Sequence, residues 1–114
     1  MTRFYQRKVD SNQSEIVTYL REAGYHVCLT HRLGEGFPDL LVARARSHAN
    51  ILVEVKQKGE LLTPAEKQFF ETWPGDKIIA YDGEDALRKL ETLYAAVNLS
   101  ARREKRIDSA TKRE

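Results

Sequence analysis

Three residues with chemically reactive side chains lie at the ends of two short apolar runs. Glu54 and Lys56 close one run, and Asp39 follows Pro38 at the start of another. Side chains alternate between the two faces of a strand, so Glu54 and Lys56 project from the same face. If the two strands pair, two carboxylates and one ammonium converge. Two acids beside a lysine can hold a divalent cation and prepare a water for attack on a phosphodiester.

A simpler interpretation of Glu54 and Lys56 is a cross-strand ion pair on an exposed edge strand, worth less than about 1 kcal/mol. Asp39 alone could be a turn residue that begins a strand. An acid and an amine in an otherwise apolar strand are costly to bury unless something binds there. The meeting of all three groups therefore favours the chemical interpretation, and their mutual repulsion without a cation predicts a metal requirement.

The positions of apolar and turn-forming residues predict the elements that bring these groups together. Asn12 and Glu15 resemble a capping box that opens a first helix, and residues 1–10 give no clear element. Gly24 ends that helix. Alternation and turn residues then predict strands over residues 25–32, 39–44, 51–56 and 77–81.

Two further helices are indicated. Thr63, Pro64 and Glu66 form a strong helix start, with a cap, a proline at the first position and a glutamate at the third. The aromatic residues of this helix share one face and are expected in the core: Phe69, Phe70 and Trp73. A last helix opens at residues 83–85. The order αβββαβα predicts an α/β domain with a partly antiparallel sheet and one helical crossover.

Composition fits a soluble globular domain, since 41% of the 114 residues are hydrophobic and 32% are charged. No apolar run approaches the roughly 20 residues that span a bilayer, and no signal peptide opens the chain. We therefore expect no membrane partner, and the lone cysteine favours a reducing cytoplasm. The single cysteine, Cys28, has no partner for an intramolecular disulfide and is expected to be a small buried hydrophobe.

Charge is unevenly distributed along the chain. Residues 101–114 carry six basic and three acidic residues, a net charge of +3, which leaves −1 for residues 1–100 because the total is +2. We expect one domain over residues 1–100 and a basic, charged tail over 101–114. A basic tail favours contact with a polyanion, and a solvated terminus is the simpler alternative.

The segments GFPDLL (36–41) and VEVK (53–56), in this order of elements, resemble the PD-(D/E)xK nuclease superfamily. Within it the chain is similar to the small stand-alone VRR-NUC nucleases of bacteria and phages, over about residues 12–90, which implies the cytoplasm of a bacterial or phage-infected cell. The segment LTPAE (62–66) is similar to the helix start of that group. The resemblance implies a restriction-endonuclease-like αβββαβ core, with a mixed four-stranded sheet flanked by helices and a C-terminal helix.

The resemblance also implies roles for individual residues. Asp39 and Glu54 match the metal ligands, and Lys56 matches the catalytic lysine. Glu15 matches a first-helix acid that assists the metal, although a capping role also explains it. The backbone carbonyl of Val55 is a further candidate ligand. An all-oxygen set suits Mg²⁺ or Mn²⁺.

Other residues are candidates for contact with substrate, with ordinary surface positions as the alternative. His31 and Arg32 end the first predicted strand near Asp39, and Lys58 follows the catalytic strand. Relatives usually carry a glutamine near the start of the second helix, where this chain has Glu66. Glu66 completes a capping box and also faces inward, so a capping role and a site role both explain it. Gln68 is the alternative for this motif, although it points away from the aromatic face.

Together these features predict a Mg²⁺- or Mn²⁺-dependent DNA endonuclease. A homodimer is expected, since paired nucleases bring two sites to two strands. Structure-selective cleavage is implied by the resemblance alone. One alternative is a Holliday-junction resolvase with the same catalytic residues. The other is a DNA-binding module that keeps the nuclease fold without catalysis, which has no need for Asp39, Glu54 and Lys56 together.

Overall fold

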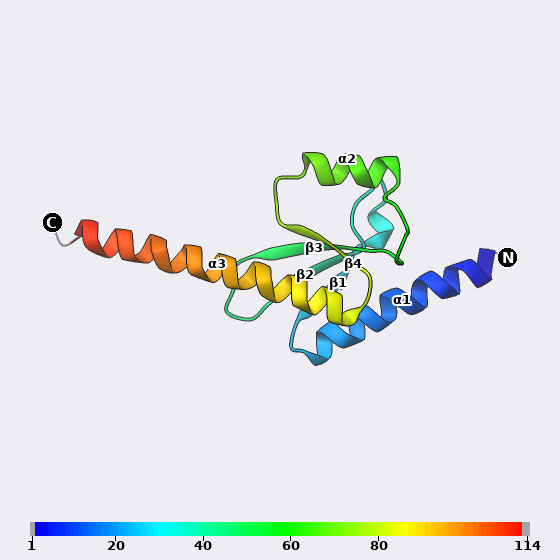
Figure 1. Ribbon diagram of the computed structural model, residues 1–114, viewed down its shortest axis with the longest axis horizontal. Coiled ribbons are helices and arrows are strands. Elements are labelled where there is room, and N and C mark those ends of the chain that lie inside the picture. Colours follow the sequence, from blue (N-terminus) through cyan, green and yellow to red (C-terminus); the bar gives the residue numbers. More distant parts are fainter. Residues whose placement is uncertain (1, 113–114) are drawn as a thin grey trace.

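The computed structural model describes the backbone of residues 2–112 and the side chains of residues 12–99. Its elements, in chain order, are α1 (Thr2–Glu22), β1 (His26–Leu29), the 3₁₀ helix η1 (His31–Leu33), β2 (Leu40–Ala43), β3 (Asn50–Val55), α2 (Pro64–Thr72), β4 (Lys77–Ala80) and α3 (Gly83–Lys112). Figure 1 shows α2 on one side of the sheet and α1 and α3 on the other. None of the described helices is long and apolar enough to cross a membrane.

The sheet is mixed and its strands lie in the order β1-β2-β3-β4. The first three strands pair antiparallel, and β4 pairs parallel to β3 after the chain crosses over through α2. A parallel pair needs such a crossover because its strands run in the same direction. The predicted four-stranded α/β fold is therefore confirmed.

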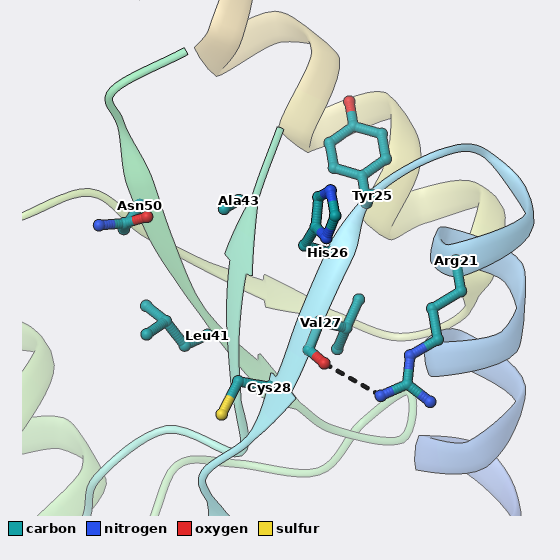
Figure 2. Close-up of a pocket in the computed structure, with 8 residues that line it drawn as sticks. All are labelled: Arg21, Tyr25, His26, Val27, Cys28, Leu41, Ala43 and Asn50. Atoms are coloured by element: carbon teal, nitrogen blue, oxygen red, sulfur yellow. Dashed lines mark hydrogen bonds between the residues drawn. The ribbon is translucent and has the colours of Figure 1, made fainter. Parts of the chain in front are cut away.

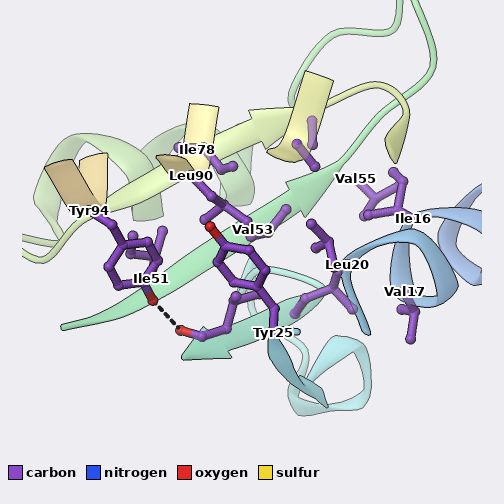
Figure 3. Close-up of a cluster of buried hydrophobic side chains, with 14 residues drawn as sticks. Ile16, Val17, Leu20, Tyr25, Ile51, Val53, Val55, Ile78, Leu90 and Tyr94 are labelled. Carbon is purple, nitrogen blue, oxygen red and sulfur yellow. Dashed lines mark hydrogen bonds between the residues drawn. The ribbon is translucent and has the colours of Figure 1, made fainter. Parts of the chain in front are cut away.

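One face of the sheet forms the hydrophobic core against α1 and α3 (Figure 3). Alternate residues of β2 and β3, such as Leu40 and Val53, point into it and are fully buried. The helices contribute residues at helical spacing: Ile16, Val17, Leu20, Ala86, Leu90 and Tyr94. The Tyr94 hydroxyl donates to the carbonyl oxygens of Val42 and Ala49, at 3.3 and 3.1 Å, and so ties α3 to the β2–β3 hairpin.

The other face of the sheet carries α2, which buries none of its residues. The Phe69 ring stacks on Trp73, with 5.1 Å between centroids, and meets the edge of Phe37 at 5.2 Å. Trp73 is still 43% exposed. The expectation that Phe69, Phe70 and Trp73 belong to the core was wrong, because α2 lies over the sheet face that carries charged groups.

The start of α2 is confirmed in detail. The Thr63 hydroxyl accepts from the Glu66 N–H at 3.2 Å, and the Glu66 carboxylate accepts from the Thr63 N–H at 2.8 Å. Both halves of a capping box are present, with Pro64 at the first helical position.

The first helix differs from its prediction. α1 begins at Thr2, so Asn12 lies in its interior and the Asn12–Glu15 capping box was wrong. Residues 1–10 are polar, but they contain neither Gly nor Pro, and nothing there interrupts a helix. The first strand is also shorter than expected, since β1 ends at Leu29 and η1 takes the next residues.

Cys28 is exposed, which corrects the prediction that it is buried. It lies on β1, an edge strand, and on the sheet face that α1 and α3 do not cover. The predicted boundary at residue 100 is not a break in secondary structure either. α3 runs on to Lys112, whereas residues 113–114 and the side chains of the expected basic tail lie outside the described residues.

Candidate active site

The β2–β3 register brings Asp39 and Glu54 together. Leu40 pairs with Val53, so extending the register by one residue sets Asp39 opposite Glu54. Because Leu40 and Val53 point into the core, Asp39 and Glu54 point to the opposite face. The Asp39 carboxylate accepts a 2.8 Å hydrogen bond from the Val55 N–H. It thereby satisfies the Val55 N–H, which lies opposite the residues that precede β2.

Lys56 lies behind these acids and is 5% exposed. Its Nζ is 2.7 Å from Glu66 Oε1, 3.5 Å from Glu60 Oε2 and 3.7 Å from Glu54 Oε1. β3 lies between β2 and β4, so this is not an exposed edge strand with a surface ion pair. The simpler interpretation of Glu54 and Lys56 was therefore wrong.

Glu54 is the most confined of the acids, at 2% exposed. Burial, the neighbouring Glu66 carboxyl and the charge of Asp39 raise the pKa of Glu54 to about 10. Burial likewise raises the pKa of Asp39, against the hydrogen bond from Val55. The Oε2 atom of Glu54 has no hydrogen-bond partner among the described residues. A buried acid with an unpaired oxygen beside a second acid is the environment that a bound cation would relieve.

Glu66 and Lys56 form the ionised part of the cluster. Burial alone would raise the pKa of Glu66, but the Glu54 carboxyl, Lys56 and the Thr63 N–H lower it to about 2. Burial acts to lower the pKa of Lys56, yet the contact with Glu66 and the other acids raises it above its ordinary value. Lys56 is therefore a charged donor held by carboxylates.

These groups line a cavity of about 140 Å³ between α1, β3 and the start of α2. Its lining residues are Asn12, Gln13, Asp39, Glu54, Val55, Lys56, Gln57, Glu60 and Glu66. A water occupies about 30 Å³ in the liquid, so there is room for a cation that keeps several waters.

The donors present fit magnesium or manganese better than a softer metal. Within residues 12–99 no group of three or more His, Cys, Asp or Glu side chains is placed to hold a metal ion by itself, so a cation here needs backbone oxygens or waters as further ligands. Asp39 and Glu54 supply two carboxylates, and Mg²⁺ commonly binds through one or two carboxylates together with waters. The N–H and C=O of a strand residue point to the same side, so the Val55 carbonyl faces the Asp39 side as well.

Glu15 does not reach this cavity. It is exposed and lines a separate surface depression on α1 with Ser14 and Tyr19. The cavity instead receives Asn12, whose amide donates to the Lys56 carbonyl at 3.4 Å, and Gln13. Asn12 and Gln13 precede the buried Ile16 by four and three residues and so share its face, a spacing from which they could have been identified.

Glu66 occupies the second-helix position at the cavity, whereas Gln68 is exposed. Glu66 is held at this position because the backbone of Gly36 packs closely against the start of α2. Gly36, at φ 79°, lies so near the start of α2 that a Cβ would be 2.4 Å from the Ala65 carbonyl oxygen. Glu60, which no sequence pattern singled out, also accepts from the Gln57 N–H at 2.9 Å.

Of the remaining candidates for contact with substrate, two lie near the cavity and one lies away from it. His31 lies at the edge of the cavity, with its Nδ1 3.4 Å from Gln13 Nε2, and Arg32 is its exposed neighbour on η1. Lys58 is exposed and lines a different depression with Asp82 and Asp85. The structure therefore brings η1 to the site but not Lys58.

Comparison with known proteins gives one match. A family model described as the VRR-NUC domain matches residues 3–80, more than half of the chain. The matched range includes the candidate active site and all four strands. Neither the curated proteins nor the solved structures contain a match to this chain.

Proposed function

The chain belongs to the VRR-NUC family of the PD-(D/E)xK nuclease-like superfamily, and we propose that it is a Mg²⁺- or Mn²⁺-dependent DNA endonuclease. Nuclease activity is what the family implies, and DNA is the substrate expected of such a domain. The observation that carries the finer proposal is Asp39 facing Glu54 with Lys56 behind them. The reaction that we propose for this site is hydrolysis of a phosphodiester bond.

Asp39 and Glu54, with the Val55 carbonyl, are the residues that would hold the cation. Bound there, it would supply positive charge at the phosphate and a water activated for attack. Burial is the main cause of the raised pKa of Glu54, and Glu66 and Asp39 add to it; a bound cation would favour the ionised carboxylate and so lower that pKa.

Lys56 acts through its ammonium group. Three carboxylates hold Nζ within 3.7 Å, so its position is set before substrate arrives. From there it can donate to a phosphate oxygen or orient the attacking water, and its positive charge offsets the negative charge that develops in the transition state. Glu66 and Glu60 are positioning residues in this scheme.

A plasmid-nicking assay tests the proposal. Wild-type protein with Mg²⁺ or Mn²⁺ should convert supercoiled plasmid to the nicked form, and EDTA should stop it. Asp39→Asn and Lys56→Ala should each reduce the rate by at least about 100-fold, the scale of one preorganised electrostatic group. Nicking that survives in EDTA or in either variant would overturn the mechanism.

Two matched controls separate chemistry from general charge. Asp76→Asn and Lys58→Ala make comparable substitutions at exposed positions that do not line the cavity. Both should nick at nearly the wild-type rate. Far-UV circular dichroism of each variant checks that the fold is intact.

A further inference from the structure

The sheet face that carries the active site continues, uncovered, across β2 and β1. His26 and Cys28 of β1 are exposed, and their pairing partners are Ala43 and Leu41 of β2. Residues 39, 41 and 43 alternate with the core residues Leu40 and Val42, so this face is the one to which Asp39 points. The surface is thus continuous with the candidate site along a single strand.

A shallow depression of about 430 Å³ lies on this part of the sheet (Figure 2). Its lining residues are Arg21, Tyr25, His26, Val27, Cys28, Leu41, Ala43 and Asn50, and none of them is acidic. Figure 2 shows Arg21 reaching over from α1 to the edge of β1. We call the depression and its lining residues the β1–β2 face.

Three residues of the β1–β2 face can donate to an anion. The Arg21 guanidinium donates to the Val27 carbonyl at 3.0 Å, which uses one of its five N–H groups and leaves others for a ligand. His26 and Asn50 are exposed and carry further N–H donors. None of the three is in an ion pair with another described residue.

The cavity of the candidate active site, unlike the β1–β2 face, is lined by several acidic residues. It holds Lys56 among four acidic residues, Asp39, Glu54, Glu60 and Glu66. Phosphates that neighbour the one in the cavity are repelled by carboxylates and favoured by a surface that lacks them and carries donors. The β1–β2 face is such a surface. Asp39 and Ala43 are four residue steps apart along the chain, about 14 Å in an extended strand, so a nucleic-acid strand at the cavity can extend over the β1–β2 face.

We propose that the β1–β2 face binds the sugar–phosphate backbone of DNA on one side of the scissile phosphate, with Arg21, His26 and Asn50 as donors to phosphate oxygens. The inference rests on the proposed function and extends it from the reacting phosphate to the strand beside it. Contacts of this kind fix the position of the DNA without reading its sequence.

The single cysteine provides a direct test, because Cys28 lies on the β1–β2 face and is exposed. The rate at which iodoacetamide, a neutral reagent, alkylates Cys28 is measured in EDTA with and without saturating duplex DNA. Bound DNA should slow the reaction at least about fivefold. The control is Cys28→Ser combined with Thr92→Cys, which moves the thiol to an exposed position on α3 and should alkylate at the same rate with and without DNA.

Substitutions test the donors by fluorescence anisotropy of labelled duplex DNA in EDTA. Asn50→Asp puts a negative charge on the face and should raise the Kd about tenfold, and Arg21→Gln should raise it about fivefold and lower the salt slope by about one. Asn98→Asp and Arg88→Gln make the same substitutions on α3 and should leave the Kd unchanged. If Arg21→Gln does not fold, Asn50→Asp decides alone.

The outcomes separate this inference from the proposed function. Protection of Cys28 without any plasmid nicking supports the face and removes the endonuclease assignment. Nicking without protection of Cys28, or with an unchanged Kd for Asn50→Asp, overturns the face and leaves the endonuclease. Wild-type protein that neither binds nor nicks DNA overturns both.

Discussion

The two faces of the sheet differ in what they bury. The face toward α1 and α3 buries apolar side chains completely, among them Leu20, Leu90 and Tyr94. The face toward α2 buries the charged pair Glu54 and Lys56, and α2 itself contributes no buried residue. Apolar burial is the main stabilising term in folding, whereas buried charge is costly. We infer that the face toward α1 and α3 stabilises the domain. Burial of the charged site residues on the face toward α2 lowers that stability.

The largest effect on stability should come from the core face. Leu90→Ala removes a fully buried side chain and should lower the free energy of unfolding by about 3 kcal/mol. Leu61→Ala is the matched control, since Leu61 is 85% exposed, and it should cost less than about 0.5 kcal/mol. Urea denaturation measures both. Equal losses would contradict the assignment of stability to this face.

The next effect concerns Glu54 and pH. The pKa of Glu54 is about 10 in the folded protein against an ordinary 4.5, so between these values the folded state holds a proton that the unfolded state releases. Its contribution to stability is therefore complete below pH 4.5 and lost as pH rises towards 10. In EDTA, raising the pH from 6 to 8 should lower the free energy of unfolding by up to about 2.7 kcal/mol, which is about 1.36 kcal/mol per pH unit for one proton.

Glu54→Gln provides the comparison for this pH effect, because it keeps the histidines and removes the titrating carboxyl. Its stability should decline less between pH 6 and 8 than that of the wild type, and Mg²⁺ should reduce the decline in the wild type alone. Glu66 does not contribute in this range, since its pKa is lowered to about 2. Identical slopes for wild type and variant in EDTA would show that Glu54 ionises freely.

A smaller effect should follow from the close contact between Gly36, which precedes β2, and the start of α2. Gly36 and Gly34 both have positive φ, but only at Gly36 would a Cβ collide with backbone, at Ala65 and Glu66. Both alanine substitutions should cost about 1 kcal/mol for the backbone conformation. Gly36→Ala should cost about 1 kcal/mol more and should slow nicking at least about tenfold by displacing Glu66. Gly34→Ala should nick normally, and equal activities would contradict this role for Gly36.

The smallest effect tests Glu66 as a positioning residue. Glu66→Ala removes the acceptor for the Thr63 N–H and the 2.7 Å contact with Lys56. It should cost about 1 kcal/mol in thermal or urea unfolding and should slow nicking. Glu66→Gln can still accept both hydrogen bonds and should restore most of the stability and activity. Failure of glutamine to rescue would mean that the negative charge is the essential property.

Local patterns predicted most of the fold. Alternation located all four strands, and the Thr63-Pro64 start of α2 was correct because capping depends on residues that are neighbours in sequence. The convergence of Asp39 with Glu54 also followed from alternation once the strands were paired in antiparallel register. These features depend on short-range geometry, which a single sequence contains.

The errors arose where the answer depends on what covers a surface. Cys28 lies in an apolar run, but its side of β1 has no covering element. Phe69 and Trp73 have core spacing, yet they pack on Phe37 and stay partly exposed. Glu15 was assigned from a motif position, whereas the phase of α1 relative to Ile16 directs Asn12 and Gln13 to the cavity. Each of these depends on tertiary packing.

The two hydrogen bonds from the Tyr94 hydroxyl have a practical consequence for shortening the chain. They join the last helix to Val42 and Ala49, at the end of the hairpin farthest from Asp39. Among the side chains that the structure describes, residues 12–99, Tyr94 is the last one of the buried core, so a chain that ends at Leu99 should keep this anchor. A stop codon only six positions earlier would remove Tyr94 and leave the hairpin without its anchor.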